Sequence, residues 1–242
     1  MLSDPQLHYL DNAATSRVDP AVAQAITTAM VEHWANPSSL YDPAVAAQDA
    51  IAAARARVAK TLHCRSDEIY FTACGSEGNN MAVIGAARPR KHWGNKIVVT
   101  GFEHPSVQRP IRALKDEGFT VVEVMPGADG RIDTQKFLAE IDKNTVLAAC
   151  MAVNNETGAV QDIAALAEVC HRHGLPLLVD NAHGAYLKFL DPSRHPLDLG
   201  ADMCCASAHK PLPVLTGGAY LHVAEGAMAA YEDEARHSLA VF

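Results

Sequence analysis

The sequence has no Cys-x-x-Cys pair, no long apolar run and no excess of basic residues. Without closely spaced pairs, its cysteines indicate neither a zinc site nor a dithiol motif, and we expect them to be buried structural thiols. They are Cys64, Cys74, Cys150, Cys170, Cys204 and Cys205. No apolar run approaches the roughly 20 residues that a membrane span needs. The net charge of −8 argues against nucleic acid or an anionic membrane surface as the main partner.

The first residues also lack the marks of a secretory leader. Residues 1–6 carry Asp4 and no basic residue before an apolar run. Together with the cysteine usage, this favours a reducing compartment, and we expect a cytoplasmic protein. The 242 residues contain no internal repeat or low-complexity linker, and they suffice to bury a substantial core as one domain.

Helix and strand patterns alternate along the chain. Helices are expected over 21–34, 45–62, 77–87, 107–117, 134–141 and 163–173, and strands over 68–72, 96–100, 120–124, 146–153, 175–180, 203–206 and 218–222. This alternation predicts a three-layer α/β/α fold with a mostly parallel central sheet. Ligands of such sheets bind at the carboxyl ends of strands. Five polar or glycine positions fall at those ends: Gly75, His104, Asn155, Asp180 and Lys210.

Two short segments carry the most specific chemistry. Ser207-Ala-His-Lys210 follows one apolar strand, and Asp180-Asn-Ala-His183 closes another. Pyridoxal phosphate (PLP) chemistry needs a lysine that holds the cofactor as a Schiff base and an acid that keeps the pyridine nitrogen protonated. The plainer alternatives are a surface lysine for Lys210 and an aspartate satisfied by backbone amides for Asp180.

The remaining candidates fit around the same cofactor. Gly75 and Ser76 open a helix, where backbone N–H groups and a hydroxyl can hold a phosphate; a serine N-cap is the alternative. Ser207 and His209 are further phosphate candidates, and His183 is a candidate partner of the phenolic oxygen of the ring.

His104 and Asn155 each follow a strand. An imidazole at position 104 can stack on a flat ring, or can be an ordinary loop histidine. An amide at position 155 can bond the cofactor or the substrate, and the same segment is also a turn former.

Five motifs carry a family resemblance: Tyr9-Leu-Asp-Asn-Ala-Ala-Thr15, Asn36-Pro-Ser-Ser39, Gly75-Ser-Glu-Gly-Asn-Asn80, Glu103-His104 and Asn154-Asn-Glu-Thr-Gly158. Through them, residues 8 to about 170 resemble the cysteine desulfurases, a class V aminotransferase branch of the fold-type I PLP enzymes. The resemblance implies that His104 stacks on PLP, that Gly75 and Ser76 hold its phosphate, that Asn155 contacts it, and that Lys210 forms the Schiff base.

The later part of the chain resembles a different family. Asp180-Asn-Ala-His-Gly-Ala185, Leu199-Gly-Ala-Asp202 and His209-Lys-Pro-Leu-Pro213 are similar to the ornithine/lysine/arginine decarboxylases, which share the fold. We therefore expect a seam between two families near residues 160–175. Pro211 is a departure, because a following proline restricts the backbone of Lys210 to extended conformations.

The resemblance also implies a domain organisation. Residues 1–15 are expected to form an N-terminal segment and residues 16–242 the PLP-binding large domain, with the C-terminal small domain absent. In both families that small domain follows the lysine, and in the desulfurases it carries a substrate-binding arginine and a persulfide cysteine. Both families also imply a homodimer.

Three functions follow as hypotheses. The first is a desulfurase-like enzyme that converts L-cysteine to L-alanine and passes sulfur to a thiol. It would use PLP as its cofactor, an amino acid as its substrate and a sulfur-acceptor protein as its partner. The second is a decarboxylase-like enzyme, favoured by Asp180 and His183. The third is a truncated or chimeric PLP-binding domain without turnover.

Overall fold

The computed structural model describes residues 8–225. Its helices are α1 (Pro20–Glu32), α2 (Asp42–Leu62), α3 (Gly75–Ala87), α4 (Pro105–Asp116), α5 (Thr134–Ala139) and α6 (Ile163–Arg172), with short 3-10 turns η1 (Ser66–Glu68), η2 (Pro89–His92) and η3 (Ala185–Phe189). Its strands are β1 (Ile69–Thr72), β2 (Lys96–Thr100), β3 (Thr120–Val124), β4 (Thr145–Met151), β5 (Leu177–Asp180), β6 (Met203–Ala206) and β7 (Ala219–Val223). Residues 1–7 and 226–242, the outer parts of the predicted segment and large domain, lie outside the described residues.

The strands form a single sheet in the order β1-β7-β6-β5-β4-β2-β3. Strands β2 to β6 run parallel to their neighbours, whereas β7 pairs antiparallel with both β6 and β1. The predicted mostly parallel sheet is confirmed. Because β2, β4, β5 and β6 point the same way, the loops that leave them gather along one edge of the sheet.

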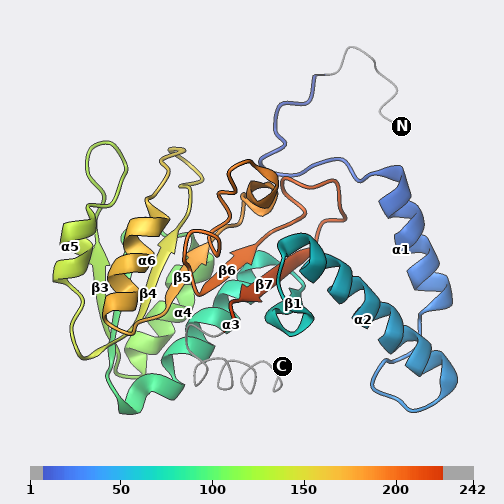
Figure 1. Ribbon diagram of the computed structural model, residues 1–242, viewed down its shortest axis with the longest axis horizontal. Coiled ribbons are helices and arrows are strands. Elements are labelled where there is room, and N and C mark those ends of the chain that lie inside the picture. Colours follow the sequence, from blue (N-terminus) through green and yellow to red (C-terminus); the bar gives the residue numbers. More distant parts are fainter. Residues whose placement is uncertain (1–7, 226–242) are drawn as a thin grey trace.

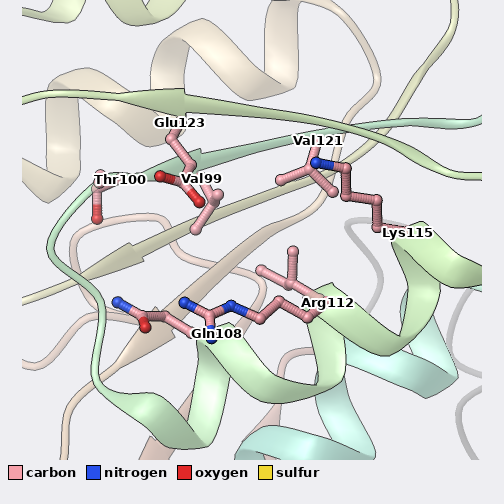
Figure 2. A pocket seen from close by; sticks show the side chains of 9 residues that line it. Val99, Thr100, Gln108, Arg112, Lys115, Val121 and Glu123 are labelled. Carbon is pink, nitrogen blue, oxygen red and sulfur yellow. The ribbon is translucent and has the colours of Figure 1, made fainter.

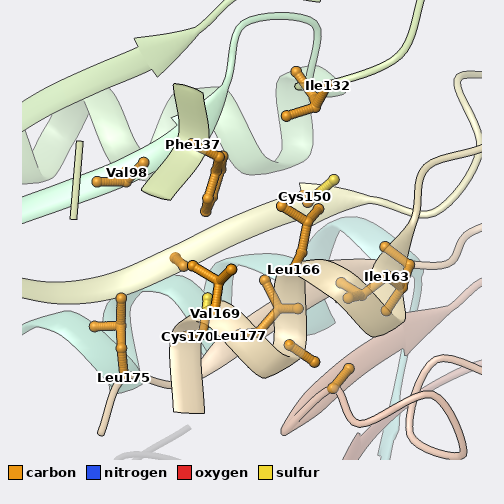
Figure 3. Close-up of a cluster of buried hydrophobic side chains, with 14 of the residues drawn as sticks. Val98, Ile132, Phe137, Cys150, Ile163, Leu166, Val169, Cys170, Leu175 and Leu177 are labelled. Carbon is orange, nitrogen blue, oxygen red and sulfur yellow. The ribbon is translucent and has the colours of Figure 1, made fainter. Parts of the chain in front are cut away.

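Helices cover both faces of the sheet (Figure 1). On one face α3 and α4 pack on alternate strand residues such as Ile97, Leu147 and Leu178. On the other face α5 and α6 enclose the cluster of Figure 3, which includes Phe137 and Leu166. This alternation gives the predicted three layers, and a strand buried on both faces explains the near-continuous apolar runs of β4 and β5.

Local signals set the helix boundaries. Asp19 caps α1 by accepting a hydrogen bond from the Ala21 N–H at 2.7 Å, and Pro20 occupies the first turn. Asp162 caps α6 in the same way through Ala165 N–H, at 3.1 Å. Gly174, at φ 62°, ends that helix in the left-handed conformation that glycine adopts without strain.

Several element boundaries differ from expectation, and the clearest cases are the following. Helices α3 and α4 begin at Gly75 and Pro105, two residues before the predicted starts, because their first turns hold glycine, proline and polar residues that carry no apolar periodicity. The turn η3 has no counterpart in the predicted elements. Within residues 8–225, no helix is both long and apolar enough to cross a membrane.

Candidate functional site

A small cavity opens at the carboxyl edge of the sheet. Its volume is about 80 Å³, and it is lined by His104, Met151, Val153, Asn155, Asp180, Ala182, His183 and Lys210. Four of the five predicted strand-end residues therefore meet here, joined by His183. The fifth, Gly75, lies at the start of α3 and is not part of the lining. Residues from positions 104 to 210 converge because the parallel strands all end at this edge.

Asp180 ends β5 with its carboxylate 95% removed from solvent. One oxygen, Oδ2, accepts a hydrogen bond from Asn79 Nδ2 at 3.0 Å, and Oδ1 accepts one from Ala182 N–H at 3.0 Å. Burial raises the pKa of Asp180, while these two donors and the nearby His104 and Lys210 oppose the rise. The carboxylate is held in place and remains available to a cation in the cavity.

A hydrogen-bonded chain links Asp180 to His104. Asn79 Nδ2 also donates to Ser106 Oγ at 2.9 Å, and Ser106 Oγ lies 2.8 Å from His104 Nδ1. The backbone N–H of Ser106 donates to the same Nδ1 at 3.1 Å. An Nδ1 that accepts carries no proton, so the neutral His104 ring has its hydrogen on Nε2. The network fixes both the tautomer and the orientation of the ring.

Lys210 lies opposite Asp180 with its Nζ 3.3 Å from His183 Nε2. Burial lowers the pKa of Lys210, and burial together with the charge of Lys210 lowers the pKa of His183. Both shifts favour the neutral form of each base. A half-buried lysine with a depressed pKa differs from an ordinary surface lysine.

Lys210 and Pro211 lie in a turn after β6. Lys210 lies in a turn closed by hydrogen bonds from Lys210 N–H to Ser207 O (3.0 Å) and from Leu212 N–H to Ala208 O (2.9 Å). Both donors flank Pro211, so the missing proline N–H leaves no bond unmade. Ser16 Oγ also donates to Lys210 O at 2.8 Å, which ties the N-terminal region to this turn.

The two asparagines after β4 have separate roles. Asn154 Oδ1 accepts hydrogen bonds from the N–H groups of Glu156 (3.1 Å) and Thr157 (2.8 Å), so it forms the turn. Asn155 lines the cavity instead. Asn154 therefore forms the predicted turn, and a role for Asn155 in the site stays a prediction.

The start of α3 adjoins the turn that carries Lys210. A Cβ on Gly75 would lie 2.3 Å from Ser207 Oγ, so a larger residue at this position would require the Ser207 hydroxyl to move. Ser76 follows in the first helical turn. The predicted phosphate residues Gly75, Ser76 and Ser207 therefore lie together. His209 turns its Nδ1 to the Gly218 carbonyl at 3.0 Å and is absent from the cavity lining.

Three residues of the site escaped the sequence reasoning. Asn79 and Ser106 connect Asp180 to His104. Asn79 stands within the motif that begins at Gly75, and the spacing of four residues between them, one turn of α3, was the available signal. The third is Glu103, which is buried. Its carboxyl group accepts a hydrogen bond from the Thr100 hydroxyl and another, at 2.6 Å, from the Met151 N–H. Burial raises the pKa of Glu103 to about 8.

A larger hollow of about 390 Å³ lies between α4 and strands β2 and β3 (Figure 2). Arg112, Lys115 and Glu123 line it. None of the predicted site residues does, so the chemistry concentrates in the smaller cavity at the carboxyl edge.

The aminotransferase class V family model matches residues 8–224. The chain belongs to this family. A similar class V relative is the cysteine desulfurase IscS of Methylococcus capsulatus, 37% identical over 203 residues that cover 84% of this chain and 49% of that protein. The cysteine desulfurase IscS of Methylobacillus flagellatus is 36% identical over 206 residues, again 84% of this chain and 49% of the relative. The chain spans about half the length of the curated relatives it matches.

Solved structures agree with the class V assignment. The chain is similar to SspA in complex with cysteine, with a TM-score of 0.80 and 33% identity over 90% of this chain and 61% of that one. A NifS-like protein at 23% identity, with a TM-score of 0.81 over 96% of this chain and 69% of that one, shows the same fold. The family match covers both sides of residues 160–175, so a single family accounts for the chain there, and the predicted decarboxylase resemblance is not shown.

Proposed function

We propose that the cavity binds PLP and that the chain carries out the PLP-dependent chemistry of a cysteine desulfurase. Relatives named as cysteine desulfurases, at 36–37% identity over most of this chain, support the reaction. The observation that carries the cofactor proposal is the pairing of buried Asp180 with half-buried Lys210 in one cavity.

The donor set fits the cofactor. A buried carboxylate needs cationic or hydrogen-bond-donating partners. Asn79 and Ala182 each donate one hydrogen bond to Asp180, which also lines the cavity and can accept a further bond from a cationic ring N–H there. The close approach of Gly75 to Ser207 brings the N–H groups of the first α3 turn beside a hydroxyl, an arrangement suited to a phosphate.

Each residue has a role under this proposal. Asp180 would bind the pyridine N–H, and His104, held by Ser106, would lie against the ring. Lys210 Nζ would hold the aldehyde carbon, and its lowered pKa increases the fraction of neutral amine at neutral pH. His183 Nε2, at 3.3 Å, is placed to accept or return the proton of that amine.

The bound cofactor would supply an electron sink for bonds at the α-carbon of an amino acid. Asn155, at the rim, and Gly75, Ser76, Ser207 and His209 complete the proposed cofactor contacts. No cysteine lines the described cavity, so the sulfur of L-cysteine must pass to a thiol from elsewhere. We extend the proposal to a homodimer, an amino-acid substrate, a sulfur-acceptor protein and, since the described cysteines are free, a cytoplasmic location.

The test is product formation from L-cysteine by the 242-residue chain with added PLP and dithiothreitol. We expect equal amounts of alanine and sulfide, and neither with Lys210→Ala. Carbon dioxide from ornithine, lysine or arginine would instead establish the decarboxylase alternative. PLP binding without any product would contradict the desulfurase proposal for this chain while leaving the cofactor site intact.

A further inference from the structure

A second cluster of metal-binding side chains lies away from the cavity. His195, Cys204 and His222 are buried, with exposures of 0%, 0% and 3%, and their ligand atoms all lie within 4.8 Å of one another. Cys204 on β6 stands directly opposite His222 on β7 in the antiparallel register, and His195 comes from the loop before β6. Three segments thus place two imidazoles and a thiol at one point in the core.

The polar atoms of this cluster are not satisfied by the protein. His195 Nδ1 and His222 Nδ1 are buried without a hydrogen-bond partner, and His222 Nε2, which makes no hydrogen bond, lies 3.5 Å from Glu68 Oε2. His195 Nε2 lies 3.6 Å from Cys204 Sγ. Buried polar side chains nearly always have a partner, so several orphan nitrogens in one cluster require an explanation.

Two more donors adjoin His222. Cys64, at the end of α2, and Glu68 form a second group with His222 whose ligand atoms also lie within 4.8 Å of one another. Glu68 already accepts hydrogen bonds from the N–H groups of Arg65 (3.0 Å) and Glu225 (3.2 Å). The Cys64 thiol is half-buried, and a hollow of about 360 Å³ reaches Cys64 and His222. This hollow offers an ion a path to the cluster.

We propose that His195, Cys204 and His222 bind Zn²⁺. In tetrahedral coordination, a sulfur about 2.3 Å and a nitrogen about 2.0 Å from zinc lie about 3.5 Å apart. The 3.6 Å between Cys204 Sγ and His195 Nε2 matches this spacing. Imidazole nitrogens and a thiolate are ligands that zinc prefers, and a metal would satisfy the unpartnered imidazole nitrogens.

The protonation states are compatible with a metal. Burial lowers the pKa of both His195 and His222 to about 4, so their ring lone pairs are free at neutral pH. Burial raises the pKa of Cys204, so its thiol is protonated in the absence of metal. Binding therefore forms a zinc–sulfur bond and releases the thiol proton to solvent, and no redox change is involved.

The proposed site is separate from the cavity. Cys204 is the second residue of β6, whereas Lys210 follows the end of that strand. A bound ion would join the loop before β6 to strands β6 and β7. The sequence contains no local motif for this site, because the three ligands come from three separate segments.

The experiment is a competition titration of the 242-residue chain with Zn²⁺ against a chromophoric chelator, together with a Co²⁺ spectrum. We expect one Zn²⁺ per chain, a higher melting temperature with Zn²⁺, and the thiolate-to-cobalt charge-transfer band with strong tetrahedral visible bands. The Co²⁺ spectrum is read on the unmodified protein, so it does not depend on a variant that folds poorly. Absence of stoichiometric metal, or a Co²⁺ spectrum without sulfur character, would overturn the proposal.

Matched variants locate the ion. Cys204→Ala is expected to lower Zn²⁺ affinity by more than about 100-fold, beyond the loss typical for an outer partner of a ligand, and to remove the charge-transfer band. Cys170→Ala, an equally buried cysteine on α6, should bind as the unmodified chain does. Equal affinity in Cys204→Ala and Cys170→Ala, or loss of binding in His183→Ala, would place the metal elsewhere and contradict the site.

Discussion

Asn79 Nδ2 donates a hydrogen bond to Asp180 Oδ2 at 3.0 Å, across 101 residues of sequence. This contact ties helix α3 to the end of β5, and the same amide group supports Ser106 and, through it, His104. The orientation of two proposed cofactor contacts, Asp180 and His104, thus depends on Asn79, which is 1% exposed.

Asn79→Ala is expected to destabilise the fold by about 1–3 kcal/mol, because it leaves the buried Asp180 carboxylate without one of its donors. It should also weaken PLP binding, since His104 loses its support. Urea unfolding and a PLP titration measure the two effects. Asn95→Ala is the control, since Asn95 donates one exposed bond to Gly118 O at 3.2 Å. Equal effects of the two substitutions would contradict the network.

Gly75→Ala is expected to cost about 1–3 kcal/mol, because its Cβ would lie 2.3 Å from Ser207 Oγ. The next atom, Ser207 Cβ, would be at an ordinary 3.6 Å. Ser207→Ala removes the conflicting oxygen, so the double variant Gly75→Ala/Ser207→Ala should recover most of the lost stability. A double-mutant cycle of melting temperatures measures this coupling. Strictly additive losses would show that the two residues do not approach as described.

The buried Glu103 should make the stability of the fold depend on pH. Its pKa, raised by burial to about 8, exceeds the value of 4.5 in an unfolded chain, so the folded protein holds one more proton between these values. Stability from this group is complete below about pH 4.5 and is lost as the pH rises towards 8. Glu103→Gln keeps an acceptor for Met151 N–H but cannot ionise.

The melting temperature of Glu103→Gln relative to the unmodified protein should therefore rise between about pH 5 and about pH 8. Scanning calorimetry at several pH values provides the comparison, and every other carboxyl group is common to both proteins. If the difference in melting temperature between the two proteins stayed constant across this pH range, Glu103 would have an ordinary pKa.

Much of the architecture could be predicted because apolar periodicity reports burial directly. The strands 96–100, 120–124 and 203–206 have the predicted bounds, and the meeting of His104, Asn155, Asp180 and Lys210 follows from parallel strands that end at one edge. Polar first turns of helices carry no such pattern, which is why α3 and α4 start earlier than expected.

Contacts between distant side chains could not be predicted in the same way. The Asn79 to Ser106 bond depends on how α3 packs beside α4, and Cys204 faces His222 only because β7 runs antiparallel to β6. Neither the packing of two helices nor the direction of a strand can be recognised from a local sequence pattern. Each cysteine by itself indicates only a buried thiol.

The most direct test of the cofactor site is the absorption spectrum of the purified chain titrated with PLP, with Lys210→Ala as the control. We predict a visible band that saturates at one PLP per chain and that is missing in Lys210→Ala. A band of equal strength in both proteins would show that PLP binds without Lys210, and no band in either would show that this cavity does not bind PLP.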